Sequence, residues 1–505
     1  MQAQIQGSKA AITITTMAAA LMAMIDISIV NVALTDIRAS FGTPIDQIGW
    51  VSTGYMMANI VVIPMTGWFQ RRFGFRAYFT ASILVFTVAS ALCGTAWNLP
   101  ALVAFRVLQG LGGGAIIPTA QSILFARYPR EQHGMAAGLF GLGAITGPLL
   151  GPTIGGYMID WASWHWIFLV NVPIGLAVAF AIPRVLKEPD FKPDRAKIDA
   201  VGIGLLAVGM ASLQYVLEEG NREGWSDSTL ILALGAVASI ALVTFIVHEL
   251  EHPNPVVDLR VFKNRSYAAG TGLNFLLGLA VFGASYLFSL YCGAVMHYQA
   301  LDIGRIFLVA GASQILLMPI IGRMSGKVDP RYLLVIGVTV TTMSQWIAAH
   351  LTADAAFSDL VWPNLVRSFG LVFVFVPVSV AALSDLPAEQ RGNATGLFNL
   401  TRELGGSLGT ALMGKVVADG IAQHSAQLSE HISAYSPIAQ EQWMNLARRG
   451  MDAASTMLGR VTREAMVLSF EDGFRKTMLA IGLGIVMVLL LKRPSPQAGA
   501  PSGAH

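Results

Sequence analysis

Two ionisable residues lie inside long apolar stretches, where a charged side chain is costly. Asp26 lies in MAMIDISIVNVAL and Arg106 lies in LVAFRVLQGLGGG. A charge at the centre of a bilayer costs on the order of 3 kcal/mol, so such a residue indicates a functional site. Burial favours the neutral form of a carboxyl group and a nearby guanidinium favours the carboxylate. We therefore predict that Asp26 takes up and releases a coupling proton and that Arg106 modulates it. The alternative is a permanent ion pair that ties two helices together.

A second charged site is predicted in the C-terminal half of the chain. Arg402 and Glu403 are adjacent in FNLTRELGG, and Arg367 lies in another apolar stretch. Adjacent positions on a helix point about 100° apart, so we do not expect Arg402 and Glu403 to face one cavity together. Glu403 would attract cations and the two arginines would attract anions, which leaves the charge of any ligand open.

Polar residues also recur at helical spacing within the apolar stretches. Ser52, Tyr55 and Asn59 stand at positions i, i+3 and i+7 and give one helix a polar stripe. Such a stripe suits a water-accessible cavity, and a set of hydrogen bonds between helices is an equally good explanation. The other candidates for a substrate cavity are Asn31, Gln109, Asn274, Gln314, Gln345 and Asn399.

A glycine-rich apolar stretch, 134–158, must position these groups. Its glycines recur at every fourth residue, at Gly143, Gly147, Gly151 and Gly155. This spacing draws a strip without side chains along one helix face, which is a surface for another helix. Pro148 and Pro152 flank the strip and each removes a backbone donor, so we expect the helix to bend.

The same region occurs twice in the chain. The pattern P-x-E-Q-[HR]-G-x-A-x-G-L-F-x-L begins at Pro129 and again at Pro387. Gly405 and Gly409 in the second copy correspond to Gly147 and Gly151 in the first. Two related halves are typical of transporters in which one half rocks against the other around a site near the bilayer midplane.

Composition excludes a soluble enzyme. Hydrophobic residues make up 54% of the 505 residues and charged residues 12%, and the mean hydropathy is +0.59. This is the composition of an all-α polytopic membrane protein. The sequence has no P-loop of the form GxxxxGK[ST], which argues against ATP as the driving force. We expect no enzymatic activity, no metal, no cofactor and no nucleic-acid partner; the net charge of +3 reflects loop residues that set topology.

The apolar stretches predict fourteen membrane-spanning helices arranged as 6 + 2 + 6. Residues 1–197 would form an N-terminal six-helix bundle, 198–252 two inserted helices, and 253–493 a second, pseudo-symmetric six-helix bundle. The short connections that are rich in arginine fall on one side of the membrane in this arrangement. Cytoplasmic loops carry an excess of basic residues, so this side is the cytoplasmic one, and both termini lie on it. The long connection 418–473 is expected to form helices on or above the outer membrane surface, as a lid, a partner contact or a plain linker, and 494–505 a disordered cytoplasmic tail.

The motifs together resemble those of the major facilitator superfamily, in particular its fourteen-span drug:proton antiporters of the Emr and Qac types. They are IDISIVNVAL, GWFQRRFGFR, RVLQGLGGG, GPLLGPTIGG and WHWIFLVNVPIG. The resemblance implies the major facilitator fold, with Asp26 and Arg106 at the acidic and basic positions. It also implies a cytoplasmic gating loop formed by Gly67, Arg71, Arg72, Gly74 and Arg76. Arg71 stands where the family usually has an aspartate, so the gating contacts must differ here.

The resemblance further implies proton-driven export of amphipathic compounds across a bacterial inner membrane by alternating access. The long last outer loop is similar to that of Emr-type subunits, which work with a periplasmic adaptor and an outer-membrane channel. Two alternatives stay open: a proton-coupled exporter or importer dedicated to one metabolite, such as a siderophore or fatty acid, and a non-transporting receptor or sensor on the same fold.

Overall fold

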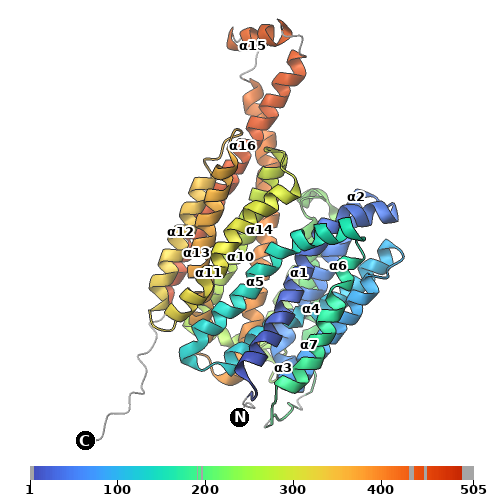
Figure 1. Ribbon diagram of the computed structural model, residues 1–505, viewed down its shortest axis with the longest axis vertical. Coiled ribbons are helices and arrows are strands. Elements are labelled where there is room, and N and C mark those ends of the chain that lie inside the picture. Colours follow the sequence, from blue (N-terminus) through green and yellow to red (C-terminus); the bar gives the residue numbers. More distant parts are fainter. Residues whose placement is uncertain (1–4, 190, 195–196, 431–436, 449–451, 492–505) are drawn as a thin grey trace, which may run out of the picture.

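The computed structural model describes residues 5–189, 191–194, 197–430, 437–448 and 452–491 (Figure 1). In these ranges the chain is helical throughout, apart from turns, connections and one isolated bridge between Gln6 and Lys187. The tail predicted for 494–505 lies outside the described residues. We call the end of the bundle where α1 begins, next to the arginine-bearing connections, the basic face. The opposite end is the far face.

The first half contains a long helix that joins two predicted spans. The helices are α1 (Lys9–Phe41), α2 (Ile45–Ile48), α3 (Trp50–Cys93), α4 (Leu99–Arg127), α5 (His133–Trp161), α6 (Trp166–Leu169) and α7 (Asn171–Val185). Within α3, Gly74 interrupts the helical geometry with φ 80° and ψ 163°. Few residues other than glycine adopt such a positive φ, so α3 consists of two helical parts that meet at Gly74.

The remaining helices follow the predicted order. They are α8 (Ala200–Glu219), α9 (Thr229–Glu251), α10 (Arg265–Ala294), α11 (Ala300–Met324), α12 (Pro330–Ala348), α13 (Phe357–Leu383), α14 (Ala388–Glu430), α15 (Pro437–Arg448), α16 (Ala453–Gly482) and α17 (Gly484–Leu490). Ten stretches among the described residues are long and apolar enough to cross a membrane, α3 counting once. The count of fourteen spans and the 6 + 2 + 6 division stay predictions.

The glycine strip of α5 packs against α1. A Cβ atom at Gly147 would lie 2.3 Å from the Cβ of Met24, and one at Gly155 would lie 2.7 Å from Cγ1 of Ile29. The second copy of the repeat, in α14, packs in the same way against α10. A Cβ at Gly405 would lie 2.2 Å from the carbonyl oxygen of Phe275 in α10. In both halves glycines bring the repeated helix close to the opening helix. The side chains of Pro148 and Pro152 lie outside the described residues, so the predicted bend stays a prediction.

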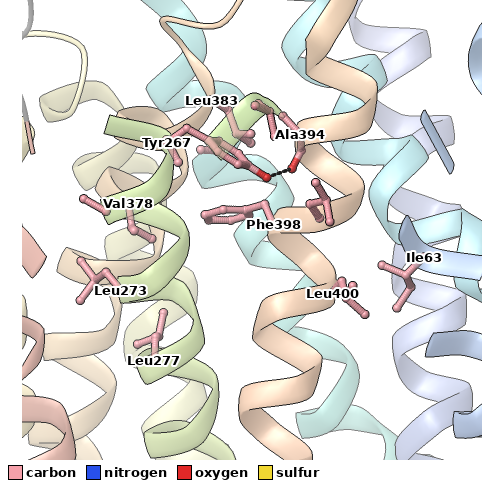
Figure 2. Close-up of a cluster of buried hydrophobic side chains, with 14 of the residues drawn as sticks. Ile63, Tyr267, Leu273, Leu277, Val378, Leu383, Ala394, Phe398 and Leu400 are labelled. Atoms are coloured by element: carbon pink, nitrogen blue, oxygen red, sulfur yellow. Dashed lines mark hydrogen bonds between the residues drawn. The ribbon is translucent and has the colours of Figure 1, made fainter. Parts of the chain in front are cut away.

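The two halves share a buried apolar cluster. It includes Ile63 of α3, Tyr267 of α10, and Phe398 and Leu400 of α14. Figure 2 shows Ile63 beside Leu400, and the Tyr267 hydroxyl donating a hydrogen bond of 2.8 Å to the Ala394 carbonyl. Burial of these apolar side chains holds α14 of the second half against α3 of the first half.

The connection after α14 is helical and extends beyond the far face of the bundle. α14 and α16 continue past the far face as a packed pair, and α15 lies at their tip (Figure 1). Gly420 of α14 packs against Ser469 of α16, and His424 pairs with Asp472 at 2.9 Å. These contacts keep the two helices together beyond the bundle, so the connection stands upright.

Candidate functional site

Asp26 is buried completely inside the first half and is surrounded by donors. Oδ2 accepts a hydrogen bond of 2.8 Å from Nη1 of Arg106 in α4. Oδ1 accepts from Nε2 of Gln109 at 2.8 Å and from Nδ2 of Asn171 at 2.7 Å. Asp26 is 0% exposed and Arg106 is 1% exposed. The three donors occupy both carboxyl oxygens and hold Asp26 in one orientation between α1, α4 and α7.

Arg106 has a full set of partners of its own. Its Nε donates to the Val51 carbonyl at 3.1 Å, and Nη1 also donates to Oε1 of Gln109 at 2.7 Å. The guanidinium lies 4.2 Å from the ring centroid of Tyr55, which adds a cation–π contact. Arg106 is therefore held in one place by α3 and α4, and it offers Asp26 a fixed positive charge.

Sequence reasoning found the acid and the base but missed part of their surroundings. Asn171 was not predicted, although it lies in the WHWIFLVNVPIG motif. Ser90 was also missed, and its Oγ accepts hydrogen bonds of 3.1 Å from both Gln109 and Asn171. Gln109 was expected in a substrate cavity and instead lies in this cluster. The signal for Asn171 was a polar residue at the start of an otherwise apolar helix.

Arg367 occupies the corresponding place in the second half with different partners. Its Nη2 donates to Oδ1 of Asn364 at 2.8 Å and Nη1 donates to Oγ of Ser285 at 3.2 Å. Among the described residues, no carboxylate lies within ion-pairing distance of Arg367. Among the described residues the fully buried acid–base pair therefore belongs to the first half, whereas Arg367 joins α13 to α10 through its hydrogen bond to Ser285.

A small void lies between the halves, with a volume of about 10 Å³, close to the space that one water molecule needs. Its polar lining residues are Asn59 of α3 and Asn399, Arg402 and Glu403 of α14. Arg402 and Glu403 both line it, contrary to the expectation from their spacing. Their long side chains bend toward each other, with 3.4 Å between Nη2 and Oε1. In this conformation the void is too small for a drug-sized ligand. The halves must move apart to form a chamber of that size.

The other predicted cavity residues are spread over several places. Ser52 donates to Asn31 at 3.1 Å near the far face, Asn274 donates to the Phe398 carbonyl at 2.6 Å, and Gln345 lines a second void beside Arg367. Gln314 is buried in α11. The stripe on α3 is therefore divided, because Tyr55 packs on Arg106 while Asn59 lines the void between the halves.

The predicted gating loop lies at the basic face, where the halves touch. A Cβ at Gly67 would lie 2.4 Å from the backbone nitrogen of Asn393 in α14. Nη1 of Arg72 donates to the Asp194 carbonyl at 2.7 Å. The Glu188 carboxylate accepts from the backbone nitrogens of Phe75 and Arg76 at 3.1 and 2.8 Å. Arg71 lines a pocket of about 180 Å³ with Lys192 and three acidic residues.

Further hydrogen bonds join the halves at this face. Nδ2 of Asn399 donates to Oε1 of Gln121 at 2.6 Å, and Nδ1 of His133 lies 3.0 Å from Oγ of Ser384. A Cβ at Gly134 of α5 would lie 2.2 Å from the carbonyl oxygen of Gly322 in α11. The basic face is closed in this structure.

Comparisons with known proteins agree with this architecture. The family model of the Major Facilitator Superfamily matches residues 16–410. The multidrug export protein EmrB of Escherichia coli strain K12 is 34% identical over 512 residues, covering 100% of this chain and 99% of that protein. EmrB of Haemophilus influenzae is 34% identical over 492 residues, with 97% and 96% covered. The fatty acid resistance protein FarB of Neisseria gonorrhoeae is 31% identical over 497 residues, with 98% and 97% covered.

Solved structures share the fold at low sequence identity. The human organic anion transporter MFSD10 superposes with a TM-score of 0.62 at 12% identity, covering 94% of this chain and 100% of that one. The proton:xylose symporter XylE superposes with a TM-score of 0.58 at 12% identity, covering 94% and 96%. The matched family model spans most of the chain and the relatives span nearly all of it, so the protein belongs to the major facilitator superfamily.

Proposed function

We propose that this protein exports amphipathic drugs or toxic compounds across a membrane and that inward proton movement drives the export. Full-length similarity to two multidrug export proteins supports the export of drugs. The observation that carries the proton role is the buried Asp26, whose two oxygens meet three donors from α4 and α7. Each proton moving inward contributes about 2.3 kcal/mol per 100 mV.

The position of Asp26 on α1 suggests how proton and substrate are coupled. Asp26 faces the interior of the first half, whereas its neighbour Ile27 lines the void between the halves. A substrate that fills this void pushes on α1, and a shift of α1 alters the distances from Asp26 to Arg106 and Asn171. Protonation becomes favourable when those donors withdraw.

We place the substrate between the halves, at the void next to Arg402 and Glu403. The void is lined mainly by apolar side chains, including Ile27, Met56 and Ile63, and apolar walls with a few polar groups suit an amphipathic ligand. Glu403 is partly exposed there, with 25% of its side-chain surface accessible. It is the acid best placed to meet a cationic substrate.

Asp26→Asn tests the proton role. We expect the variant to lose proton-coupled efflux of cationic, neutral and acidic test compounds from everted vesicles, while folding normally, because asparagine keeps the size and cannot exchange a proton. Asp36→Asn on the exposed end of the same helix is the matched control and should transport like wild type. Unchanged proton-coupled efflux by Asp26→Asn would reject the assignment of this acid.

The cargo is tested in the same vesicles. Because one relative is named for fatty acid resistance, the panel should include a long-chain fatty acid beside the drugs. Export of several unrelated compounds supports a multidrug exporter, and export of one compound supports a dedicated carrier. No efflux of any compound by the wild type, in vesicles that hold a proton gradient, would point to the receptor alternative.

We further propose that both termini lie in the cytoplasm of a bacterial cell with the protein in its inner membrane, and that the α14–α16 extension docks a periplasmic adaptor of a tripartite pump. The helix at its tip, α15, exposes Trp443 and Met444, and α16 exposes Leu458. Exposed aromatic and methionine side chains are typical of protein interfaces.

Shortening the extension tests the docking proposal. Residues 427–461 are replaced by a short glycine–serine linker, which retains the His424–Asp472 pair and Arg463. We expect the shortened protein to lose co-purification with an adaptor and to keep efflux in reconstituted vesicles. Retained association with the adaptor would remove the docking role of this segment.

A further inference from the structure

A cluster of metal-ligating side chains lies at the basic face, away from the transport path described above. Asp199 precedes α8, and His248 and His252 lie at the end of α9 and just after it. One ligand atom from each of the three residues lies within 4.8 Å of the others. The sequence HELEH at 248–252 has the spacing His-Glu-x-x-His, which places two histidines on one helix face. The expectation of no metal overlooked this motif.

The distances in the cluster suit a tetrahedral ion. Nε2 of His248 lies 2.9 Å from Oδ2 of Asp199, and Nδ1 of His252 lies 3.8 Å from the same oxygen. Ligand atoms at about 2.1 Å from a tetrahedral zinc ion lie roughly 3.4 Å from one another. The two observed separations bracket this value, so small rotations of the histidine rings would bring the three atoms into place.

Solvent can reach the cluster. The side chains of His248 and His252 are 27% and 29% exposed, while that of Asp199 is 3% exposed. The Asp199 carboxyl group accepts a hydrogen bond of 2.8 Å from the Gly202 amide and lies 2.9 Å from Nε2 of His248, which fixes its orientation. A carboxylate under two accessible imidazoles is a good ligand set for a borderline-soft cation.

A second observation points to a missing ligand at the same place. Glu249 is fully buried, and its Oε1 has no hydrogen-bond partner among the described residues. A Cβ atom at Gly202 would lie 2.5 Å from this Oε1 and 2.5 Å from Oδ2 of Asp199, so the two oxygens lie no more than 5.0 Å apart. A buried carboxylate oxygen without a donor is costly. A cation nearby would offset part of that cost.

We propose that Asp199, His248 and His252 bind one divalent transition-metal ion of the zinc class. The ion would replace the proton that His248 shares with Asp199 and would displace the weak 3.3 Å hydrogen bond from the Asn254 amide to Nδ1 of His252. It would clamp the start of α8 to the end of α9. In zinc peptidases the glutamate of this motif activates water. Here Glu249 is buried and its Oε2 accepts from the Val257 amide, so the proposal is for binding alone.

The test measures Zn²⁺ binding to the full-length protein in detergent, purified with a tag that lacks histidine. We expect one Zn²⁺ per chain by calorimetry and elemental analysis, and Co²⁺ should give the strong visible absorption of tetrahedral coordination. His248→Gln and His252→Gln should weaken Zn²⁺ affinity by roughly a hundredfold. His424→Gln is the matched control, because His424 also pairs with an aspartate at 2.9 Å, and among the described residues no second histidine joins that pair.

Thermal unfolding distinguishes a variant that has lost Zn²⁺ binding from one that has misfolded. Zn²⁺ should raise the unfolding midpoint of the wild type and of His424→Gln, since a ligand that binds only the folded state stabilises it. It should leave the midpoint of His252→Gln unchanged. The proposal is overturned if Zn²⁺ does not bind saturably, if His248→Gln and His252→Gln bind it like wild type, or if His424→Gln loses it equally.

Discussion

At the residue scale, the two halves carry matching arginines in different settings. Arg106 faces a carboxylate at 2.8 Å, whereas the guanidinium of Arg367, within the part of the chain that the structure describes, donates to the amide of Asn364 and the hydroxyl of Ser285 and pairs with no carboxylate. A buried arginine without a counter-ion cannot take part in charge exchange with a proton-binding acid. The pseudo-symmetry of the helices therefore does not extend to the chemistry, and proton handling is proposed for one half only.

Asn171 is expected to matter as much for stability as for transport. Asn171→Ala removes one of two donors to Oδ1 of Asp26 and a donor to Ser90. Leaving buried acceptors short of a donor costs about 1–3 kcal/mol, so the thermal unfolding midpoint in detergent should fall clearly. Asn31→Ala is the control, because Asn31 is exposed and only accepts from Ser52. Equal midpoints for the two variants would contradict the role of Asn171.

The sequence allowed part of this site to be predicted. Asp26 and Arg106 stand out because ionisable residues are rare in apolar helices, and helix direction places them at similar depth. Asn171 and Ser90 could not be assigned, since their place depends on how α7 and the second part of α3 pack, which local spacing does not determine. Gln109 was misplaced for the same reason. Arg402 and Glu403 show that long side chains can reach one cavity from adjacent positions.

At the element scale, helix existence was easier to predict than helix extent. Apolar length located the helices, and the glycine spacing located the contact of α5. The polar parts of α14 and α16 beyond the bundle could be predicted as helices, but their pairing could not, because it depends on contacts between the two helices such as that of Gly420 with Ser469. The two parts of α3 fall on two separate apolar stretches, and the non-helical backbone at Gly74 divides them.

Gly147→Ala tests the close packing of α5 on α1. A methyl group there would meet Met24 at 2.3 Å for its Cβ and 2.8 Å for its backbone carbon. Overpacking of this kind costs about 1–3 kcal/mol, so we expect a lower unfolding midpoint and slower efflux. Gly156→Ala in the same helix is the control, because no atom lies within 4 Å of the added methyl group. If both variants behave alike, the close contact is not required.

At the scale of the whole molecule, the two halves are in contact at the basic face, as one end state of the proposed alternating access requires. The halves meet at the basic face through Gly67 with Asn393 and through Gly134 with Gly322. The void between them is too small for a drug. Opening at this face would break these backbone and small polar contacts and would also expose part of the apolar cluster that Ile63 shares with Phe398 and Leu400.

His133 makes the closed contact sensitive to pH. Burial, aided by the positive charges of Arg391 and Arg130, lowers the pKa of the His133 imidazole to about 4, whereas an exposed histidine titrates near about 6.5. Between these values the separated halves bind a proton at His133 and the closed halves do not. Stability of the closed contact is therefore complete above about pH 6.5 and falls as the pH drops toward 4.

Spin labels can measure this opening. One label replaces Ala77 in the first half and the other replaces Tyr332 in the second, both exposed near the basic face. We expect the population of long inter-label distances to grow as the pH falls from 7 to 5 in the wild type, and to change less in His133→Gln, which keeps a polar contact to Ser384 but cannot take up a proton in this range. His350→Gln, an exposed histidine in the second half, should behave like wild type. An identical pH response in wild type and His133→Gln would assign the opening to another group. Asp26 is the next to test, because its protonation is proposed to accompany a shift of α1.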